Sequence, residues 1–323
     1  MDHELMRILT GGWVAQATFA AVRLGVVDAL DGRRLTPGEV ADEVGAHPEA
    51  LHRLLRLLEG VGLADADDGG YALTPMGARL RRDDLGPLAA LYGEDFFAAA
   101  WNGLEQAVRT GEPAFEHVHG EPVFAHLAAD PGRAAVFNAG MAAGASFFRG
   151  VPDAYDFSGP RRVVDLAGGT GALLGTILRS NPEATGVLFD LPEVIAAAPG
   201  HLSRMGVLDR CELAAGDLFS CVPEGGDVYL LSRILHDWDD ERCAALLATC
   251  AKAMEPGAEL LVIERVVGGG SYVPLAFDLH MMVMTGGRER TEEEYRALLE
   301  DADLTPGRLI DLPLGMRMLT ATR

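Results

Sequence analysis

The chain has 323 residues, of which 49% are hydrophobic, and a formal net charge of −21 at pH 7. This length and apolar content predict a folded protein with at least two domains. The charge argues against a nucleic-acid partner, because binding to a phosphate backbone requires clustered lysine and arginine. No apolar run of 18 or more residues lacks charge, so no membrane span and no membrane partner are expected.

The first residues and the cysteines both indicate a cytoplasmic protein. The opening segment, MDHELMRILTGG, lacks the basic region of a secretory signal peptide. No C-x-x-C spacing occurs among the four cysteines, and we expect free thiols in a reducing compartment at Cys211, Cys221, Cys243 and Cys250.

Residues 4–30 carry apolar side chains on more than one face of a helix, among them Leu5, Ile8, Leu9, Trp13 and Phe19. A helix that is apolar on several faces must be covered on several sides. We expect a second copy of the chain to cover the apolar faces of this N-terminal helical segment, which predicts a homodimer.

A winged helix-turn-helix pattern follows. Thr36 and Glu39 form a capping box with Pro37 in the first turn, a second helix starts at Pro48, and 71–74 reads as a short strand. This pattern often binds DNA, but many acidic residues surround it here. We therefore predict a dimerisation or lid module, and keep a ligand-responsive regulator as an alternative.

Residues 86–150 are predicted to be helical and contain seven of the twelve phenylalanines. Most of these should form a core, although aromatic side chains beside a cofactor domain also suit a flat apolar ligand. His117 and His119 have no third ligand nearby, so we expect no metal site. The predicted domains are 1–85 (winged helix), 86–150 (helical pocket region) and 151–323 (cofactor domain).

Residues 161–192 read as strand, glycine turn, helix and strand. The turn holds Gly168, Gly169 and Gly171, and the second strand ends at Asp190, where a carboxylate can accept hydrogen bonds from ribose hydroxyls. The third glycine of the dinucleotide fingerprint is absent. Asp165, just before the glycines, suits a cationic ligand better than a pyrophosphate. Together these features favour S-adenosylmethionine.

The remaining strands are predicted at 211–214, 227–231 and 259–266, with a helix at 241–254. The alternation of strands and helices predicts an α/β fold with a parallel, doubly wound, Rossmann-like sheet. In such sheets ligands bind at the carboxyl ends of the strands. The candidate site residues near those ends are Asp165, Asp190, Asp217, His236 and Glu264.

The ordered motifs VVDLAGGTG, LFDLP, GDLF, ILHDWDD and GGRERTEEE resemble those of the S-adenosylmethionine-dependent O-methyltransferases of the plant caffeate and bacterial antibiotic-tailoring type. The resemblance runs nearly the whole chain and includes a winged-helix dimerisation domain. The ILHDW motif is the most specific part. The family uses S-adenosylmethionine, releases S-adenosylhomocysteine and needs no metal.

The resemblance also implies residue roles. His236 would be the general base, and Glu264 and Glu289 would flank its imidazole. Substrate contacts would come from Phe137, Met141, Trp101, His280 and Met284. Cofactor contacts would come from Asp165, Gly168, Gly169, Gly171, Asp190, Leu191, Gly216, Asp217, Leu218, Phe219, Ser232 and Arg233.

Two positions depart from the family pattern: Ala167 stands where a third consecutive glycine is common, and Ser232 where plant members often have lysine. The resemblance implies O-methylation of a hydroxyl group on an aromatic or polyketide-like secondary metabolite. We expect this hydroxyl to be phenolic. It also reaches homologues that hydroxylate, decarboxylate or close rings, and N-methyltransferases. These readings stay open, and the acceptor cannot be named from the sequence.

Overall fold

The computed structural model describes residues 2–323, which form two compact units. The first unit is the chain up to Asn102 together with Val118–Ser146. The second unit is Gly103–His117 together with Phe147–Arg323.

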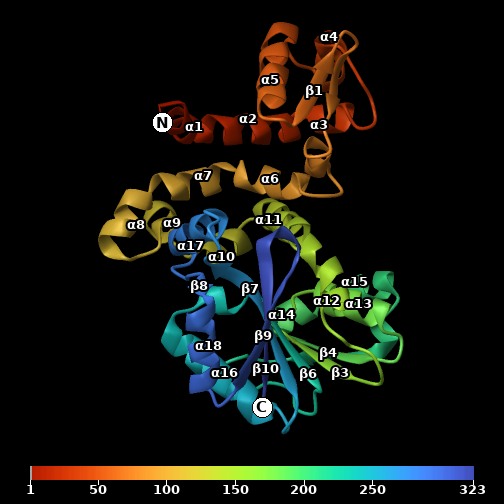
Figure 1. Ribbon diagram of the computed structural model, residues 1–323, viewed down its shortest axis with the longest axis vertical. Coiled ribbons are helices and arrows are strands. Elements are labelled where there is room, and N and C mark those ends of the chain that lie inside the picture. Colours follow the sequence, from red (N-terminus) through yellow and green to blue (C-terminus); the bar gives the residue numbers. More distant parts are fainter. Residues whose placement is uncertain (1) are drawn as a thin grey trace. The chain divides into compact units, whose positions relative to one another are not determined.

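The first unit begins with the expected winged-helix arrangement (Figure 1). Thr36 caps its helix as predicted: its hydroxyl accepts from the Glu39 N–H, and the Glu39 carboxylate accepts from the Thr36 N–H at 2.8 Å. A small core includes Val26, Leu51 and Leu55. The elements are α1 (Asp2–Leu9), α2 (Gly11–Arg23), α3 (Val26–Ala29), α4 (Pro37–Val44), α5 (Pro48–Gly60), β1 (Ala64–Asp67) and β2 (Gly70–Leu73).

The N-terminal helices keep much of their apolar surface exposed. Ile8 is 71% and Trp13 73% exposed, and Leu5, Met6 and Leu9 are all more than half exposed. In the same unit, α6 packs against α2 and α11.

The helices from residue 77 to 150 are divided between the two units. They are η1 (Gly77–Leu80), α6 (Gly86–Tyr92), α7 (Asp95–Asn102), α8 (Leu104–Thr110), α9 (Ala114–His119), α10 (Val123–Ala128), α11 (Pro131–Gly144) and η2 (Ser146–Gly150).

The second unit is built on an eight-stranded sheet with the order β5-β4-β3-β6-β7-β10-β9, in which β8 pairs with β7. The five strands β5, β4, β3, β6 and β7 are parallel to one another, as predicted. The strands are β3 (Arg162–Leu166), β4 (Thr185–Asp190), β5 (Cys211–Ala215), β6 (Val228–Ser232), β7 (Glu259–Val267), β8 (Arg290–Thr291), β9 (Thr305–Asp311) and β10 (Met316–Thr322).

The five strands predicted from the sequence are parallel, but the sheet has two further long strands, β9 and β10, that were not predicted. Strand β10 is antiparallel to both β7 and β9. The connection between β9 and β10 includes only the short helix η5 (Pro313–Gly315), and such a short link reverses the chain, whereas a parallel crossover needs a dozen or more residues. The sheet is therefore mixed.

Helices cover both faces of this sheet (Figure 1). Neighbouring strand residues point to opposite faces, so Val163 packs into the core under α13 and Val164 into the core under α16. One side carries α12 (Val151–Ala154), α13 (Ala172–Ser180) and α15 (Ala198–Met205); the other carries α16 (Asp240–Ala253) and α18 (Glu292–Asp301). The remaining helices are α14 (Pro192–Ile195), η3 (Leu208–Arg210), η4 (Leu235–Asp237) and α17 (Val273–Met284).

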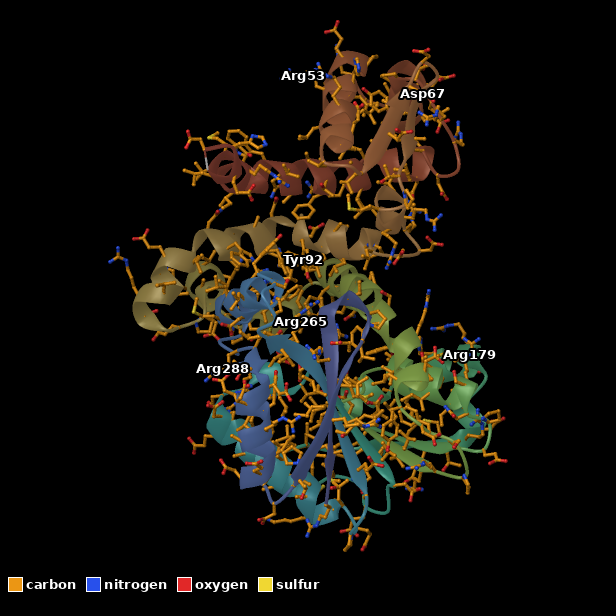
Figure 2. All side chains as sticks on the ribbon, viewed as in Figure 1. Arg53, Asp67, Tyr92, Arg179, Arg265 and Arg288 are labelled. Atoms are coloured by element: carbon orange, nitrogen blue, oxygen red, sulfur yellow. The ribbon has the colours of Figure 1, made fainter. Side chains whose placement is uncertain are left out.

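Three labelled charged side chains illustrate the exposed surface of the two units. Figure 2 shows Arg53 and Asp67 at the surface of the first unit and Arg179 at the surface of the second. Across residues 2–323, no helix combines the length and the apolar character needed to cross a membrane.

Candidate functional site

The candidate site lies at the carboxyl ends of the parallel strands. Strand β3 lies between β4 and β6, so the strand order reverses beside it. In open α/β sheets a crevice forms at this point, outside the carboxyl ends of the strands. The glycine turn follows β3, and the His236 segment follows β6.

The glycine turn is tied to the end of β4. The Gly169 N–H donates to Asp190 Oδ2 at 2.8 Å, and the Leu191 N–H donates to Asp190 Oδ1 at 2.7 Å. Gly169 has φ +62° and Gly171 φ +82°, which favour glycine. These bonds fix the Asp190 carboxylate beside the turn, where a ribose hydroxyl could donate to a remaining lone pair.

Asp165 lies beneath the same turn and is only 1% exposed. A Cβ on Gly168 would lie 2.5 Å from the Asp165 carboxyl group, so only glycine permits this approach. Asp165 Oδ2 is buried and has no hydrogen-bond partner among residues 2–323. Burial, with a smaller effect of the Asp190 charge, raises the pKa of Asp165 to about 7, although a hydrogen bond from the Leu174 backbone opposes this shift. A buried carboxyl group with one oxygen left without a partner fits a cationic ligand.

Ala167 adopts φ +52° at the start of the turn. The left-handed region costs an alanine roughly 1–2 kcal/mol relative to glycine. The turn therefore keeps its shape with one methyl group more than the usual family sequence.

Residues after β5 form a compact turn. The Asp217 carboxylate accepts from the Phe219 N–H at 3.0 Å and from the Ser220 hydroxyl at 2.9 Å; these bonds lower the pKa of Asp217. A Cβ on Gly216 would lie 2.7 Å from the Phe189 ring. Leu218 and Phe219 pack at the margin of the sheet core. Contact between this turn and an adenine ring stays a prediction.

Ser232 and Arg233 follow β6. The Ser232 hydroxyl is buried without a hydrogen-bond partner within residues 2–323. Arg233 has φ +58°, and its guanidinium carbon lies 5.8 Å from the ring centroids of both Phe147 and Phe148. These two aromatic rings orient the arginine through cation–π attraction. The sequence had marked them only as part of a phenylalanine-rich stretch.

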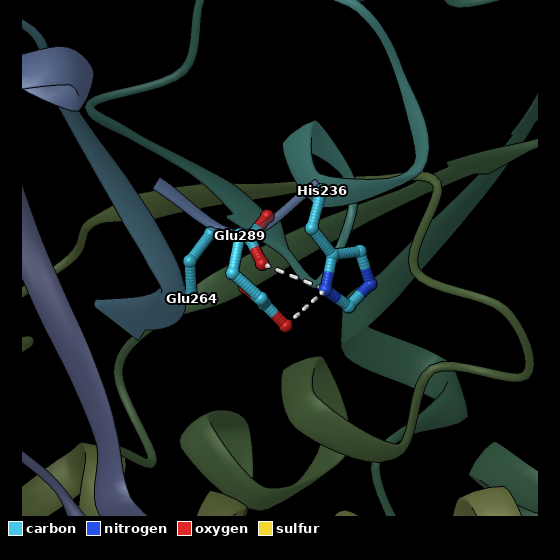
Figure 3. Close-up of side chains that lie close together, drawn as sticks. All are labelled: His236, Glu264 and Glu289. Atoms are coloured by element: carbon cyan, nitrogen blue, oxygen red, sulfur yellow. Dashed lines mark hydrogen bonds and ion pairs between the residues drawn. The ribbon is translucent and has the colours of Figure 1, made fainter. Parts of the chain in front are cut away.

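His236, Glu264 and Glu289 form a close group of side chains (Figure 3). His236 Nδ1 lies 3.1 Å from Glu289 Oε1 and 3.5 Å from Glu264 Oε2. Glu264 is 1% and Glu289 3% exposed. Glu264 Oε1 accepts from the backbone N–H groups of Ile234 and Leu235 at 2.8 Å each. These two bonds join β7 to the segment that carries the histidine.

The two carboxylates control the proton on the imidazole. Burial disfavours a charged imidazole, but the Glu264 charge and the Glu289 hydrogen bond outweigh it and raise the pKa of His236 to about 9. Burial also raises the pKa of Glu264 to about 7. A carboxylate can only accept a hydrogen bond, so Nδ1 carries a hydrogen and the neutral ring offers its lone pair at Nε2. The nearest carboxylate to Nε2 is Asp237, at 3.9 Å.

The same three side chains could also hold a metal ion. One potential ligand atom from each lies within 4.8 Å of the others. Within the described part of the chain, one oxygen of each glutamate, Oε2, has no hydrogen-bond partner. The expectation that no metal takes part stays a prediction.

The expected substrate residues fall in both units. Trp101, Phe137 and Met141 belong to the first, and His280 and Met284 to α17 of the second. Burial lowers the pKa of His280 to about 4, so its imidazole is neutral at pH 7. A neutral imidazole can donate one hydrogen bond and accept another. A pocket shared by these five residues stays a prediction.

One residue of this region was missed. Arg290 is fully buried and hydrogen-bonds the loop around His236. The GGRER motif was noted in the sequence, but nothing in it distinguished Arg290 from the half-exposed Arg288.

Asp190 holds the glycine turn, and two carboxylates hold Nδ1 of His236, beside the point where the strand order reverses. The protein is of the methyltransferase class. The chain belongs to the O-methyltransferase family: the family's O-methyltransferase domain matches residues 101–304, and its dimerisation domain matches residues 6–83.

Relatives cover nearly the whole chain. A 3-amino-4-hydroxybenzoate 4-O-methyltransferase of Streptomyces cremeus is 43% identical over 99% of this chain and 90% of its own length. The S-adenosylhomocysteine-bound structure of CalO1, a methyltransferase of calicheamicin biosynthesis, has a TM-score of 0.91 at 31% identity, covering 99% of this chain and 97% of that one. The aclacinomycin 10-hydroxylase RdmB of Streptomyces purpurascens is 35% identical over 88% of this chain and 79% of its length.

Proposed function

We propose that this protein transfers a methyl group from S-adenosylmethionine to a phenolic hydroxyl of an aromatic small molecule, with His236 as general base. The observation that carries the proposal is the placement of His236 Nδ1 against two buried carboxylates, at 3.1 and 3.5 Å. This arrangement fixes the ring and leaves Nε2 to accept a proton. The names of the Streptomyces cremeus relative and of the S-adenosylhomocysteine-bound neighbour support the acceptor and the cofactor.

The residues of the glycine turn fit the cofactor. Oδ2 of Asp165, which has no hydrogen-bond partner within residues 2–323, suits a cation, and the Asp190 carboxylate can accept from ribose hydroxyls. Bound S-adenosylmethionine supplies an electrophilic methyl group on a sulfonium sulfur. This chain's residues hold the ribose, orient the acceptor and receive its proton.

His236 suits a phenol because of its raised pKa. A phenol has a pKa near 10 and keeps its proton at neutral pH. A base with a pKa of about 9 is nearly matched to it, so the proton can move to Nε2 as the oxygen–carbon bond forms and the carbon–sulfur bond breaks. Glu264 and Glu289 then stabilise the imidazolium.

The test compares two acceptors in His236→Ala. One acceptor is a neutral phenol and the other is already ionised at the assay pH. We expect kcat for the neutral phenol to fall by roughly 10²–10⁴, with little change for the ionised acceptor and for cofactor affinity by calorimetry. A near wild-type rate with the neutral phenol would show that His236 is not the base.

Mass spectrometry of the product decides between reaction types. We expect a gain of one methyl group on oxygen. A product that gained oxygen would support the hydroxylation named for the RdmB relative. Loss of carbon dioxide would support a decarboxylase, and a methylated nitrogen would make this chain an N-methyltransferase. We also propose that the protein is a cytoplasmic homodimer through its dimerisation domain and needs no nucleic acid, membrane or metal.

A further inference from the structure

The Arg290 guanidinium is buried in the short strand β8, with 0% of the residue exposed. Its Nη1 donates to the Leu235 carbonyl at 2.9 Å, and its Nη2 donates to the Trp238 carbonyl at 2.8 Å. Its Nε and Nη2 both donate to Asp240 Oδ1, at 2.9 and 2.7 Å. The side chain thus binds three points of one loop.

That loop carries His236. Leu235 directly precedes the histidine, and Trp238 follows two residues later. The backbone of the same strand region makes a further contact: the Arg288 N–H donates to the His236 carbonyl at 2.9 Å. A Cβ on Gly287 would lie 2.0 Å from the His236 carbonyl oxygen, so the two backbones are as close as glycine allows.

The neighbouring residue Glu289 holds the imidazole itself, through Nδ1 at 3.1 Å. Glu289, the residue before β8, reaches the ring, while Arg290 in β8 reaches the loop backbone. Two adjacent residues fix both the position of the loop and the direction of the ring.

Only an arginine side chain can donate to the Leu235 and Trp238 carbonyls and to the Asp240 carboxylate at the same time. Its planar guanidinium presents five N–H donors in a fixed fork, whereas lysine offers one flexible ammonium group. Lysine could keep the charge opposite Asp240, but it could not reach both carbonyls and the carboxylate in the same directions.

We propose that Arg290 is a positioning residue for the proton transfer: it holds the 235–240 loop so that the imidazole of His236 meets Glu289 and the acceptor hydroxyl. This inference rests on the proposed role of His236 as base. Arg290 does not touch the reacting atoms, and it acts through the loop.

The experiment uses Arg290→Lys in the full-length protein with the same two acceptors, a neutral phenol and one that is ionised at the assay pH. We expect kcat for the neutral phenol to fall by about 10²-fold, the usual effect of a misplacement of about 1 Å. The ionised acceptor, which needs no base, should be methylated at close to the wild-type rate. Equal losses with both acceptors, or no loss with either, would overturn the proposal.

Arg210→Lys is a matched control. Arg210 also donates to three backbone carbonyls, at 2.7 to 3.1 Å, but it binds the end of α13 and the segment after it. The control should not change the ratio of the two rates. If Arg290→Lys does not fold, Asp240→Asn weakens the same clamp from its exposed side and should change the ratio in the same direction, to a smaller extent.

Titration of His236 by NMR separates this inference from the proposed base role. If Arg290 positions the ring, the pKa of His236 in Arg290→Lys should fall from its raised value towards 6.5, because the contact with Glu289 is lost. If His236→Ala fails to distinguish the two acceptors while this pKa still falls, the base role is wrong and the positioning is right. An unchanged pKa in Arg290→Lys would show that Arg290 does not orient the ring.

Discussion

Replacing Asp165 by asparagine should stabilise the unliganded protein and weaken cofactor binding at the same time. In the folded chain the pKa of Asp165 is raised from 3.8 to about 7 by burial. Between these values the folded state holds a proton that the unfolded state has lost, so the free energy of unfolding falls as pH rises from about 4 to 7. Asparagine has no such proton to lose.

The magnitude follows from the shift. About three pH units at 1.36 kcal/mol each give roughly 4 kcal/mol at pH 8. The new amide N–H₂ would replace the unpartnered Oδ2 and would itself lack an acceptor, at a cost of about 1–3 kcal/mol. We therefore expect Asp165→Asn to be more stable than wild type by about 1–3 kcal/mol at pH 8, and no more stable near pH 4.

The assay is urea unfolding of both proteins at pH 5 and pH 8, with calorimetry of S-adenosylmethionine binding at pH 8. The stability difference between Asp165→Asn and the wild type should grow with pH. Cofactor affinity should drop, because the carboxylate that we propose to face the cation is gone. The exposed Asp311, paired with Arg317, provides the control Asp311→Asn, which should show no such growth. A variant that was less stable than wild type at pH 8 would refute the reasoning about buried charge.

Four further predictions follow from the site and the surface. Asp190→Ala should weaken S-adenosylmethionine binding by about 1.5–3 kcal/mol in calorimetry through loss of a charged acceptor, and equal affinity for NAD would contradict the cofactor assignment. In the wild type, kcat with a neutral phenol should rise about tenfold per pH unit towards pH 9. The reason is that only about 1% of an imidazole with a pKa of about 9 is neutral at pH 7. A plateau of kcat at pH 6.5 would exclude the raised pKa of His236. Trp13→Asp should weaken a homodimer in sedimentation, since Trp13 is 73% exposed in the single chain, and a wild-type monomer at micromolar concentration would rule the homodimer out. Dialysis against EDTA should leave activity unchanged, and loss of activity restored by Zn²⁺ would make His236, Glu264 and Glu289 a metal site.

The sequence by itself determined the elements whose causes are local. The capping box at Thr36 is set within four residues, and both of its hydrogen bonds form. The glycine turn between β3 and α13 needs positive φ angles at Gly169 and Gly171, and the sequence supplies glycine there. The βαβ unit that ends at Asp190 follows from apolar runs and a helical period that can be read without the rest of the chain.

Only the tertiary structure decided which distant residues meet. Glu264 and Glu289 lie 28 and 53 positions beyond His236; the family resemblance suggested that they flank it, but the distances depend on the pairing of β6 with β7 and of β7 with β8. The antiparallel strand β10 depends on sheet order in the same way. Arg290 and Arg288 look alike in GGRER, yet Arg290 is buried against the backbone of the 235–240 loop, while the half-exposed Arg288 pairs with the carboxylates of Asp240 and Glu294. Register and strand order are set by packing across the whole sheet, and no local pattern encodes them.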